Sequence, residues 1–357
     1  MKSVGIVSYN IHCNFTNYGS ALQSWALNQA IERLGCAPTL IDYCPDSLKN
    51  ADPLNPFGLM MDRDSESQRM CKLTLPAIRE NYEKFKRFYR ERFKVAPLAD
   101  LYDGFVCGSD TIFCIDEFNG FDDAYFANEP FMRERSVAYA ASFGDAHFGD
   151  AEYVTLNSRI RNFKAIGVRE NRLIPYLLEH ASCPVERTVD PTLLQTVSAY
   201  DSIAVDSPYQ EPYLLLYARR YNPKMEAYAI RYAAEHKLKV VEISLRATNA
   251  ERGHVMRYDA GVEEFLGLVR GASYVVTNSF HGLIFAVTYL RQFAVFSRES
   301  GDSKIGEVLE LFGIPERLMV DESEPFVGQV DFASVQDRIA CARERSIAFL
   351  KRELEML

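Results

Sequence analysis

One stretch in the second half of the chain decides the fold, and it reads Tyr274-Val275-Val276-Thr277-Asn278-Ser279-Phe280-His281-Gly282-Leu283-Ile284-Phe285-Ala286-Val287-Thr288-Tyr289-Leu290. It begins with a short apolar run of strand length, and the apolar segment Gly282–Leu290 has the length of a helix. Polar residues with a turn tendency separate the two segments. The stretch therefore predicts a strand, a polar turn that contains His281, and a helix.

The same alternation of apolar runs and amphipathic segments covers the whole chain. Apolar runs predict strands at Val4–Tyr9, Thr39–Tyr43, Gly104–Cys107, Ser136–Ala140, Ala165–Val168, Val185–Val189, Tyr213–Tyr217, Lys239–Ser244, Tyr274–Thr277 and Phe293–Phe296. Helical spacing and end signals predict helices at Leu22–Leu34, Asn81–Lys94, Pro223–His236, Val262–Arg270 and Ser303–Phe312. A last helix is predicted to follow its cap residue Asp331 and to continue to Leu357. Such alternation is typical of an α/β fold with mostly parallel sheets covered on both faces.

The length of 357 residues is about twice that of a typical domain, so two domains are expected. The segment Leu194–Pro212 contains prolines and small polar residues, and a new strand–helix cycle starts after it. We expect two Rossmann-like domains facing a cleft, at residues 1–195 and 210–325, with a polar insertion near 47–68 in the first. The helix at 331–357 is expected to pack back on the first domain. Neither half has a G-x-G-x-x-G or G-x-x-x-x-G-K-[ST] loop, so dinucleotide and P-loop chemistry lack support.

The formal net charge of −9 argues against nucleic acid as a partner, because most of the surface would repel it. An anionic substrate would have to be bound by a few local arginines and lysines. The first residues lack the features of a signal peptide, and no apolar run approaches the ~18 residues of a membrane span. The eight cysteines include no Cys-x-x-Cys pair. We therefore expect a cytoplasmic protein with reduced thiols and no metal site.

Two polar turns in the first half are candidate binding sites, because ligands of open α/β sheets collect at the carboxyl ends of the strands. The first contains Asn17, Tyr18 and Gly19, where a glycine lets the backbone approach a ligand and the helix start can hold an anion. An ordinary strand-to-helix turn explains these residues equally. The second contains Ser109 and Asp110. Asp110 could bind a sugar hydroxyl or act as a base, and a helix cap is the alternative.

His281 is the strongest candidate of the second half. A histidine beside a helix start in a cleft can donate a proton or bind a phosphate oxygen. The helix N-terminus disfavours the imidazolium, so stable protonation requires an anionic ligand or a carboxylate nearby. The alternative is that His281 only fixes the turn.

Cations follow several predicted strands or open a helix. Arginine suits bidentate binding of carboxylate or phosphate, and lysine acts as a point charge. Each of them alone is compatible with a surface charge, but together they indicate a small anionic substrate. The residues are Arg169, Arg219, Arg220 and Lys304.

As an ordered set, several motifs resemble the polysaccharide pyruvyl transferase family over roughly Val4 to Phe312. The motifs are Thr16-Asn17-Tyr18-Gly19…Leu22-Gln23, Gly108-Ser109-Asp110, Tyr139-Ala140-Ala141-Ser142-Phe143-Gly144, Val168-Arg169-Glu170, Asp190-Pro191-Thr192-Leu193 and Thr277-Asn278-Ser279-Phe280-His281-Gly282. Each motif is weak alone, and the ordered set is specific. One departure concerns the family pattern Gly-Ser-Asp-Gln-x-Trp, in which Thr111 and Phe113 here replace Gln and Trp. The acceptor sugar therefore cannot be inherited from relatives.

The resemblance implies a GT-B-like fold and a transferase that moves pyruvate from phosphoenolpyruvate onto a sugar of a surface-polysaccharide precursor. The product would be a cyclic ketal, with release of phosphate and without a metal or cofactor. It implies that His281 is the key catalytic histidine and that Arg169 and Lys304 help to bind phosphoenolpyruvate. Asp110 is the candidate for acceptor binding or base. The remaining predicted substrate ligands are Asn17, Tyr18, Gly19, Ser109, Asn278 and Ser279.

Two other functions compete with this interpretation. A nucleotide-sugar glycosyltransferase of the same fold predicts a pocket for a base and ribose in the second domain. A catalytically silent sugar-binding protein predicts loss of the site residues, whereas His281, Arg169 and Lys304 are present. A lipid-linked acceptor would suit a peripheral contact at the inner face of the membrane through the basic aromatic stretch Tyr82–Lys94. A packed helix with a solvated basic face explains that stretch as well.

Overall fold

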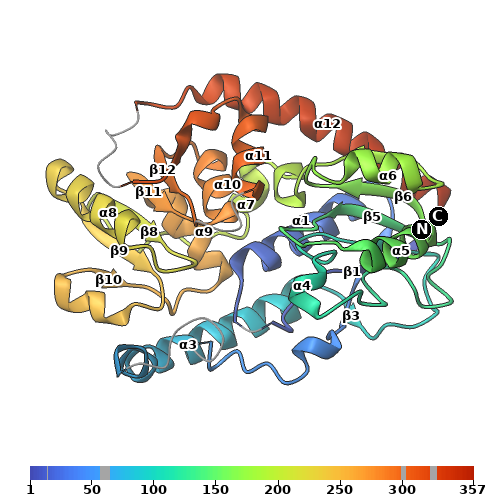
Figure 1. The fold of residues 1–357 in the computed structure, drawn as a ribbon. Coiled ribbons are helices and arrows are strands. Elements are labelled where there is room, and N and C mark those ends of the chain that lie inside the picture. Colours follow the sequence, from blue (N-terminus) through green and yellow to red (C-terminus); the bar gives the residue numbers. More distant parts are fainter. Residues whose placement is uncertain (14, 57–64, 299–302, 322–327) are drawn as a thin grey trace.

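The computed structural model describes residues 1–13, 15–56, 65–298, 303–321 and 328–357, which form two β-sheets (Figure 1). The first sheet has the order β3 (Val95–Ala96), β2 (Ala37–Ile41), β1 (Ser3–Val7), β4 (Gly104–Cys107), β5 (Ser136–Ala141), β6 (Phe163–Val168) and β7 (Val185–Arg187). The second has the order β10 (Val255–Met256), β9 (Lys239–Ile243), β8 (Tyr213–Tyr217), β11 (Tyr274–Thr277), β12 (Phe293–Phe296) and β13 (Leu318–Met319). Neighbouring strands of both sheets pair in parallel.

Helices cover both sheets. The helices of the first half are α1 (Tyr18–Arg33), α3 (Ser65–Arg92), α4 (Ile115–Phe118), α5 (Asp150–Arg159), α6 (Ile174–His180) and α7 (Val197–Asp201). Those of the second half are α8 (Pro223–His236), α9 (Val262–Gly271), α10 (Phe280–Thr288), α11 (Ser303–Phe312) and α12 (Phe332–Met356). Short 3₁₀ helices lie at η1 (Asp46–Leu48), η2 (Ile160–Asn162), η3 (Pro191–Leu194), η4 (Ala247–Arg252) and η5 (Pro315–Arg317). The predicted α/β class with two Rossmann-like units is confirmed.

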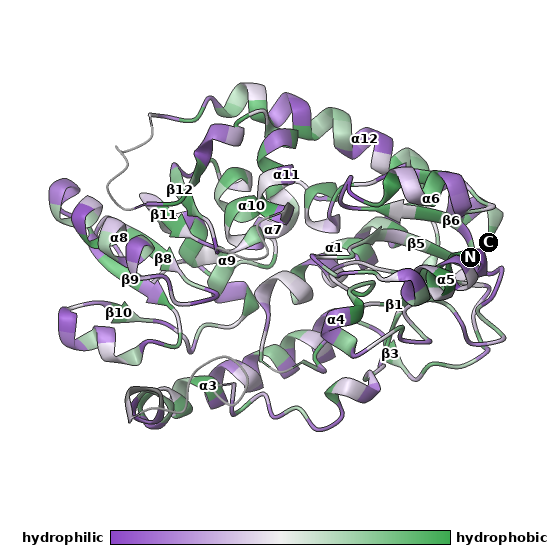
Figure 2. Cartoon of the chain, viewed as in Figure 1, coloured by the Kyte–Doolittle hydropathy of each residue, from purple (hydrophilic) through white to green (hydrophobic). Residues whose placement is uncertain are grey.

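Each sheet reverses its winding direction beside its first strand, and this fixes where a ligand can bind. In the first sheet β1 lies between β2 and β4, and in the second β8 lies between β9 and β11. The turns that leave such neighbouring strands diverge and open a crevice at the carboxyl edge of the sheet. The inner strands, such as β4, β5, β8 and β11, are buried, and Figure 2 shows hydrophobic residues along both sheets.

The helices that open at these two crevices are more buried than ordinary surface helices. Every residue of α10 is buried, and most of α1 is buried as well. They touch each other, because α1 packs against α9 and α10 of the second unit. One continuous hydrophobic core therefore includes residues of both units, such as Leu22, Tyr200 and Phe285.

Two long helices join the units on opposite sides of the molecule (Figure 1). The first, α3, begins beside η4 of the second unit, where Thr74 donates to the carbonyl of Leu245, and ends in the first. The second, α12, starts on the second unit and then packs against β6 and η3. Near its end Lys2 donates a hydrogen bond to the carbonyl of Glu355. Among the helices of the described part of the chain, none combines the length and the apolar character needed to cross a bilayer.

Several element boundaries differ from the sequence prediction. Ser65–Gln68, predicted as the end of a loop, belong to α3, whose first turns lack a strong apolar pattern; residues 57–64 of the predicted insertion lie outside the described residues. The helix predicted at Gly282–Leu290 begins at Phe280, because Ser279 caps it. His281 therefore lies in the first turn of α10 rather than in the loop before it.

Candidate active site

A cleft of about 700 Å³ lies between the carboxyl edges of the two sheets. The residues that follow β1, β4 and β6 line one wall, and those that follow β8, β9 and β11 line the other. The wall of the first unit includes Tyr9, Phe15, Asn17, Asp110, Thr111, Glu117 and Arg169. The wall of the second includes Arg219, Arg220, Tyr221, Glu226, Glu242, Arg246, Ser279, His281, Arg298 and Lys304.

The His281 ring packs directly against the first turn of α1. A Cβ atom placed on Gly19 would lie 1.8 Å from His281 Nδ1, so only glycine allows this approach. Asn17 caps α1, because its Oδ1 accepts from the amides of Gly19 and Ser20 at 3.0 and 3.4 Å. On the other side Ser279 Oγ accepts from the Gly282 amide at 3.2 Å and fixes the start of α10. The two helix starts thus hold the imidazole between the units.

Asp190 supplies the carboxylate that a protonated histidine needs. His281 Nε2 lies 3.4 Å from Asp190 Oδ2, within ion-pair distance but without hydrogen-bond geometry. Both side chains are buried, and Thr192 donates to Asp190 Oδ1 through its amide and its hydroxyl at 3.0 and 2.6 Å. Burial alone would raise the pKa of Asp190, but the neighbouring His281 and Arg169 hold it well below its usual range. Asp190 therefore remains a carboxylate facing the imidazole.

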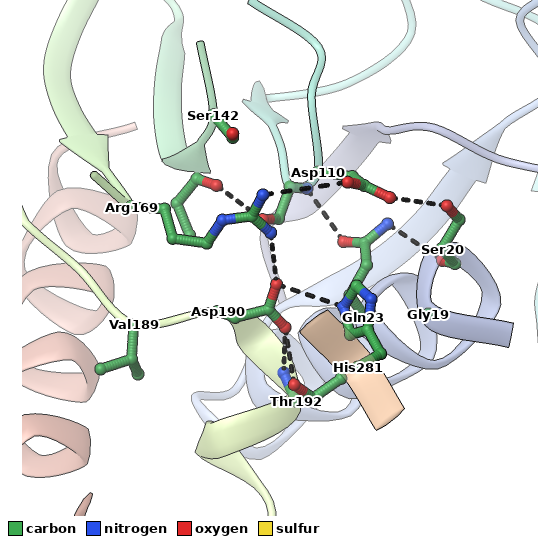
Figure 3. A network of polar contacts seen from close by, with 12 residues as sticks. Gly19, Ser20, Gln23, Asp110, Ser142, Arg169, Val189, Asp190, Thr192 and His281 are labelled. Atoms are coloured by element: carbon green, nitrogen blue, oxygen red, sulfur yellow. Dashed lines mark hydrogen bonds and ion pairs between the residues drawn. The ribbon is translucent and has the colours of Figure 1, made fainter. Parts of the chain in front are cut away.

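Arg169 lies among three carboxylates, and Figure 3 shows it between Asp110 and Asp190. Its guanidinium donates to Asp190 at 2.7 Å and to Glu170 at 3.1 Å, and it lies 3.9 Å from Asp110. Burial opposes its charge, but these carboxylates raise the pKa of Arg169. Through these two hydrogen bonds and the nearby Asp110, Arg169 fixes the carboxylates around His281. Its assignment to phosphoenolpyruvate binding stays a prediction.

Asp110 is held in a fixed orientation. Its backbone lies in the left-handed region with φ 68°, and Ser20 Oγ donates to its Oδ2 at 2.6 Å. The Thr111 amide donates to its Oδ1 at 3.0 Å. Burial favours the neutral acid, but Arg169, His281 and Lys304 lower the pKa of Asp110. The alternative role as a helix cap is wrong, because Cys114 is the N-cap residue of α4.

Four predicted substrate ligands do not line the cleft: Gly19 lies against the His281 ring, and the side chains of Tyr18, Ser109 and Asn278 lie behind the wall. Tyr18 is buried between the units, where its hydroxyl donates to the Ala260 carbonyl at 2.8 Å. Ser109 is buried, and its hydroxyl donates to the Ala140 carbonyl at 2.6 Å. Asn278 accepts from the Arg219 amide at 2.9 Å and donates to the Arg220 carbonyl at 2.8 Å. These side chains satisfy buried backbone groups and thereby shape the loops that carry the site.

The predicted cations meet in the cleft, although they come from distant parts of the sequence. Arg169, Arg219, Arg220 and Lys304 all line it. Lys304, in the first turn of α11, reaches across to the first unit, since a Cβ on Gly144 would lie 3.5 Å from its Nζ. Arg219 lies over the Phe15 ring with its Cζ 4.2 Å from the centroid. The cleft therefore contains positively charged side chains from both units.

Sequence reasoning missed several residues of the cleft. Arg246 and Arg298 follow β9 and β12, so the strand-end criterion that identified Arg219 could have found them. Asp190 belongs to the motif Asp190-Pro191-Thr192-Leu193, but only the fold shows that it lies beside His281. Glu117 lies on the four-residue helix α4, which is too short for a periodic pattern. The Thr111 hydroxyl donates to its carboxylate at 2.7 Å.

Comparisons with known proteins agree with this architecture. The sequence pattern of the polysaccharide pyruvyl transferase family matches residues 17–300. A search among curated proteins finds no significant match. Among solved structures, a putative UDP-N-acetylglucosamine 2-epimerase from Listeria monocytogenes is similar, with 13 % identity, a TM-score of 0.52 and coverage of 99 % of this chain and 97 % of the other. The S. aureus MnaA–UDP structure has 14 % identity, a TM-score of 0.50 and coverage of 100 % and 98 %. At such identities the likeness concerns the fold alone, a GT-B-like pair of Rossmann-like units.

Proposed function

Since the chain belongs to the polysaccharide pyruvyl transferase family, we propose that it transfers pyruvate from phosphoenolpyruvate to two hydroxyls of a sugar in a surface-polysaccharide precursor. The observation that carries this proposal is the position of His281. It faces the buried carboxylate of Asp190 in a cleft to which both units contribute cations. No metal or organic cofactor is required for this chemistry.

The proposed reaction balances without an oxidant or reductant. The methylene carbon of phosphoenolpyruvate gains a proton and becomes a methyl group. The central carbon forms bonds to two sugar oxygens, and its bond to the phosphate oxygen breaks. Of the two hydroxyl protons released, one is equivalent to the proton on the methyl group and the other leaves on phosphate. The products are a cyclic ketal and inorganic phosphate.

Phosphoenolpyruvate carries a carboxylate and a phosphate, which matches the cations of the cleft. Lys304 and Arg219 lie on the wall of the second unit and line the same cavity as His281. Arginine suits bidentate contacts with either anion, and lysine supplies a point charge. Because the chain as a whole has a net charge of −9, most of its surface repels a small anion. The cations of the cleft are therefore the groups that can attract one.

His281 is the proposed acid for the methylene carbon. The start of α10 disfavours a positive charge, and the ionised Asp190 beside it favours one. Removal of a well-placed general acid costs about 10²- to 10⁴-fold in rate. A phosphate-binding role for His281 is the competing assignment, and it predicts weaker binding of phosphoenolpyruvate in a His281 variant.

The direct test measures phosphate release from phosphoenolpyruvate in the presence of a panel of lipid-linked and aryl glycosides. We expect release with at least one acceptor, together with a ketal product in mass spectrometry. The same panel is incubated with nucleotide sugars in place of phosphoenolpyruvate. Turnover of a nucleotide sugar without phosphate release from phosphoenolpyruvate would establish a glycosyltransferase and refute the proposal.

A further inference from the structure

The proposed transfer needs a group that removes the proton of the attacking sugar hydroxyl, and two carboxylates of the first unit line the cleft as candidates. Asp110 was the candidate from the sequence. The other is Glu117, on α4. Their surroundings in the structure differ strongly, so the two can be compared directly.

Asp110 is poorly suited to accept a proton. Both of its oxygens already accept hydrogen bonds, from Ser20 Oγ at 2.6 Å and from the Thr111 amide at 3.0 Å. It also lies 3.9 Å from Arg169. These partners stabilise the carboxylate form, and the pKa of Asp110 is lowered despite its burial. An acceptor whose charged form is stabilised so strongly is a weak base.

Glu117 has the opposite character. Its side chain is exposed to the interior of the cleft, and Thr111 donates a hydrogen bond to its Oε2 at 2.7 Å. The protein around the cleft partly desolvates the carboxylate, and this raises the pKa of Glu117. The charged or titratable groups that act on it are Lys304, Asp110, Arg169, Tyr9 and Cys114. Of these, Lys304 is the main one that favours its ionised form.

Aromatic and aliphatic side chains of the first unit line the same cavity as this carboxylate. Tyr9 lines the cleft and packs against Phe118 of α4, with ring centroids 5.9 Å apart. Phe15 and Leu48 line the same cavity. Apolar walls with a few precisely placed polar groups are typical of sites that bind small ligands.

We propose that Glu117 is the general base of the transfer and that Thr111 orients its carboxylate toward the acceptor hydroxyl. This proposal rests on the proposed function above. As the sugar oxygen bonds to the central carbon of phosphoenolpyruvate, its proton passes to Glu117 while His281 protonates the methylene carbon. Glu117 then releases its proton to solvent, and His281 takes up a proton from solvent. The second hydroxyl attacks as phosphate leaves, and its proton departs on phosphate.

The location of Thr111 gives the proposal a second residue that can be tested. The Thr111 hydroxyl donates to Glu117 Oε2 at 2.7 Å. Thr111 acts only through Glu117, so it is a positioning residue. Thr111→Val keeps the shape and removes the donor, and we expect it to lower kcat by about 10-fold with the KM for phosphoenolpyruvate unchanged. Thr111→Ser should restore most of the rate.

The experiment compares Glu117→Gln and Glu117→Ala with wild type in phosphate release from phosphoenolpyruvate, using the acceptor found in the glycoside panel. We expect kcat to fall by at least about 100-fold, with the KM for phosphoenolpyruvate within about threefold. In wild type, kcat should fall as pH decreases through the range where Glu117 becomes protonated. Sodium formate should restore part of the rate of Glu117→Ala, because it supplies a carboxylate in the vacated space, which a merely structural role would not permit.

The matched control is Asp116→Asn, which removes a carboxylate from the neighbouring exposed position and should leave kcat unchanged. Glu117→Gln with kcat within twofold of wild type, or Glu117→Ala unaffected by formate, would overturn the assignment of Glu117 and leave the proposed function intact. If wild type releases no phosphate with any acceptor, the proposed function fails, and the role of Glu117 fails with it.

Discussion

Asp190 Oδ2 lies 3.4 Å from His281 Nε2 and accepts a hydrogen bond from Arg169 at 2.7 Å. One carboxylate oxygen thus faces the proposed acid and the arginine that fixes the site. The histidine comes from the second unit, and the carboxylate and the arginine come from the first. Catalytic competence is therefore expected to depend on how the two units are docked.

The first prediction concerns the charge of Asp190. Asp190→Asn preserves the shape but removes the negative charge beside the His281 ring. We expect kcat for phosphate release to fall by about 10- to 100-fold. The exposed Asp46, paired with Lys49, provides the control Asp46→Asn, which should leave kcat unchanged. Equal kcat values in the two variants would contradict the pairing.

The second prediction concerns the contact between Gly19 and His281. Gly19→Ala places a methyl group where the ring lies, 1.8 Å from Nδ1, so the imidazole or α1 must move. We expect activity to fall by about 100-fold, because a displacement of about 1 Å is enough to disrupt catalysis. The control is Gly306→Ala in α11, where a Cβ meets no atom within 4 Å. That variant should be as stable as wild type or more stable by up to about 1 kcal/mol.

The third prediction concerns Arg169 and stability. Arg169→Ala leaves Asp110, Asp190 and Glu170 buried without their cation, and we expect a loss of about 3–5 kcal/mol in the free energy of unfolding. The exposed Arg345 provides the control Arg345→Ala, with an expected change within about 0.5 kcal/mol. Denaturation in urea measures both. A loss in Arg169→Ala no greater than in the control would show that the carboxylates do not depend on Arg169.

The same cluster predicts a pH dependence of stability. The pKa values of Asp110 and Asp190 are lowered by folding, so the stability they provide is complete above their ordinary value of about 3.9. It is lost as the pH falls from there through the folded values. Without Arg169 the folded pKa values rise toward the ordinary value, so Arg169→Ala should lose less stability than wild type over the same fall in pH. Identical acid transitions would contradict this.

The fourth prediction concerns peripheral membrane contact, which stays a hypothesis. The aromatic side of Tyr82–Lys94 packs into the core through Phe85 and Phe88, while Lys86, Arg87 and Arg90 are exposed. If the exposed face contacts anionic lipid, charge reversal of these three residues should abolish co-sedimentation with phosphatidylglycerol vesicles. Lys86 also pairs with Glu83, and this pair weakens its attraction to lipid. Equal binding of wild type and variant would exclude this face.

The fold, and the residues at the centre of the candidate site, could be selected from the sequence because both selections depend on local pattern. Apolar strands followed by polar turns identified His281, Asp110 and Arg169 without any knowledge of their contacts. The same criterion also selected Tyr18 and Asn278, because a polar residue after a strand can serve the ligand or the backbone. Only the tertiary structure distinguishes these cases.

The remaining parts of the site are long-range relationships. Asp190 and His281 belong to different units, and no spacing rule connects them. The packing of His281 against Gly19 also depends on the docking of α10 on α1. Glu117 escaped notice because its helix is a single turn and carries no periodic signal. Composition and periodicity contain no information about these contacts.

The most direct test of the central claim is phosphate release from phosphoenolpyruvate by wild type and His281→Ala, combined with the melting temperature of each protein with and without phosphoenolpyruvate. Wild type should release phosphate only with an acceptor, and His281→Ala should lose at least about 100-fold in rate while phosphoenolpyruvate still raises its melting temperature. Loss of that stabilisation would assign His281 to phosphate binding. Equal release by both proteins would show that His281 is not the acid of the transfer.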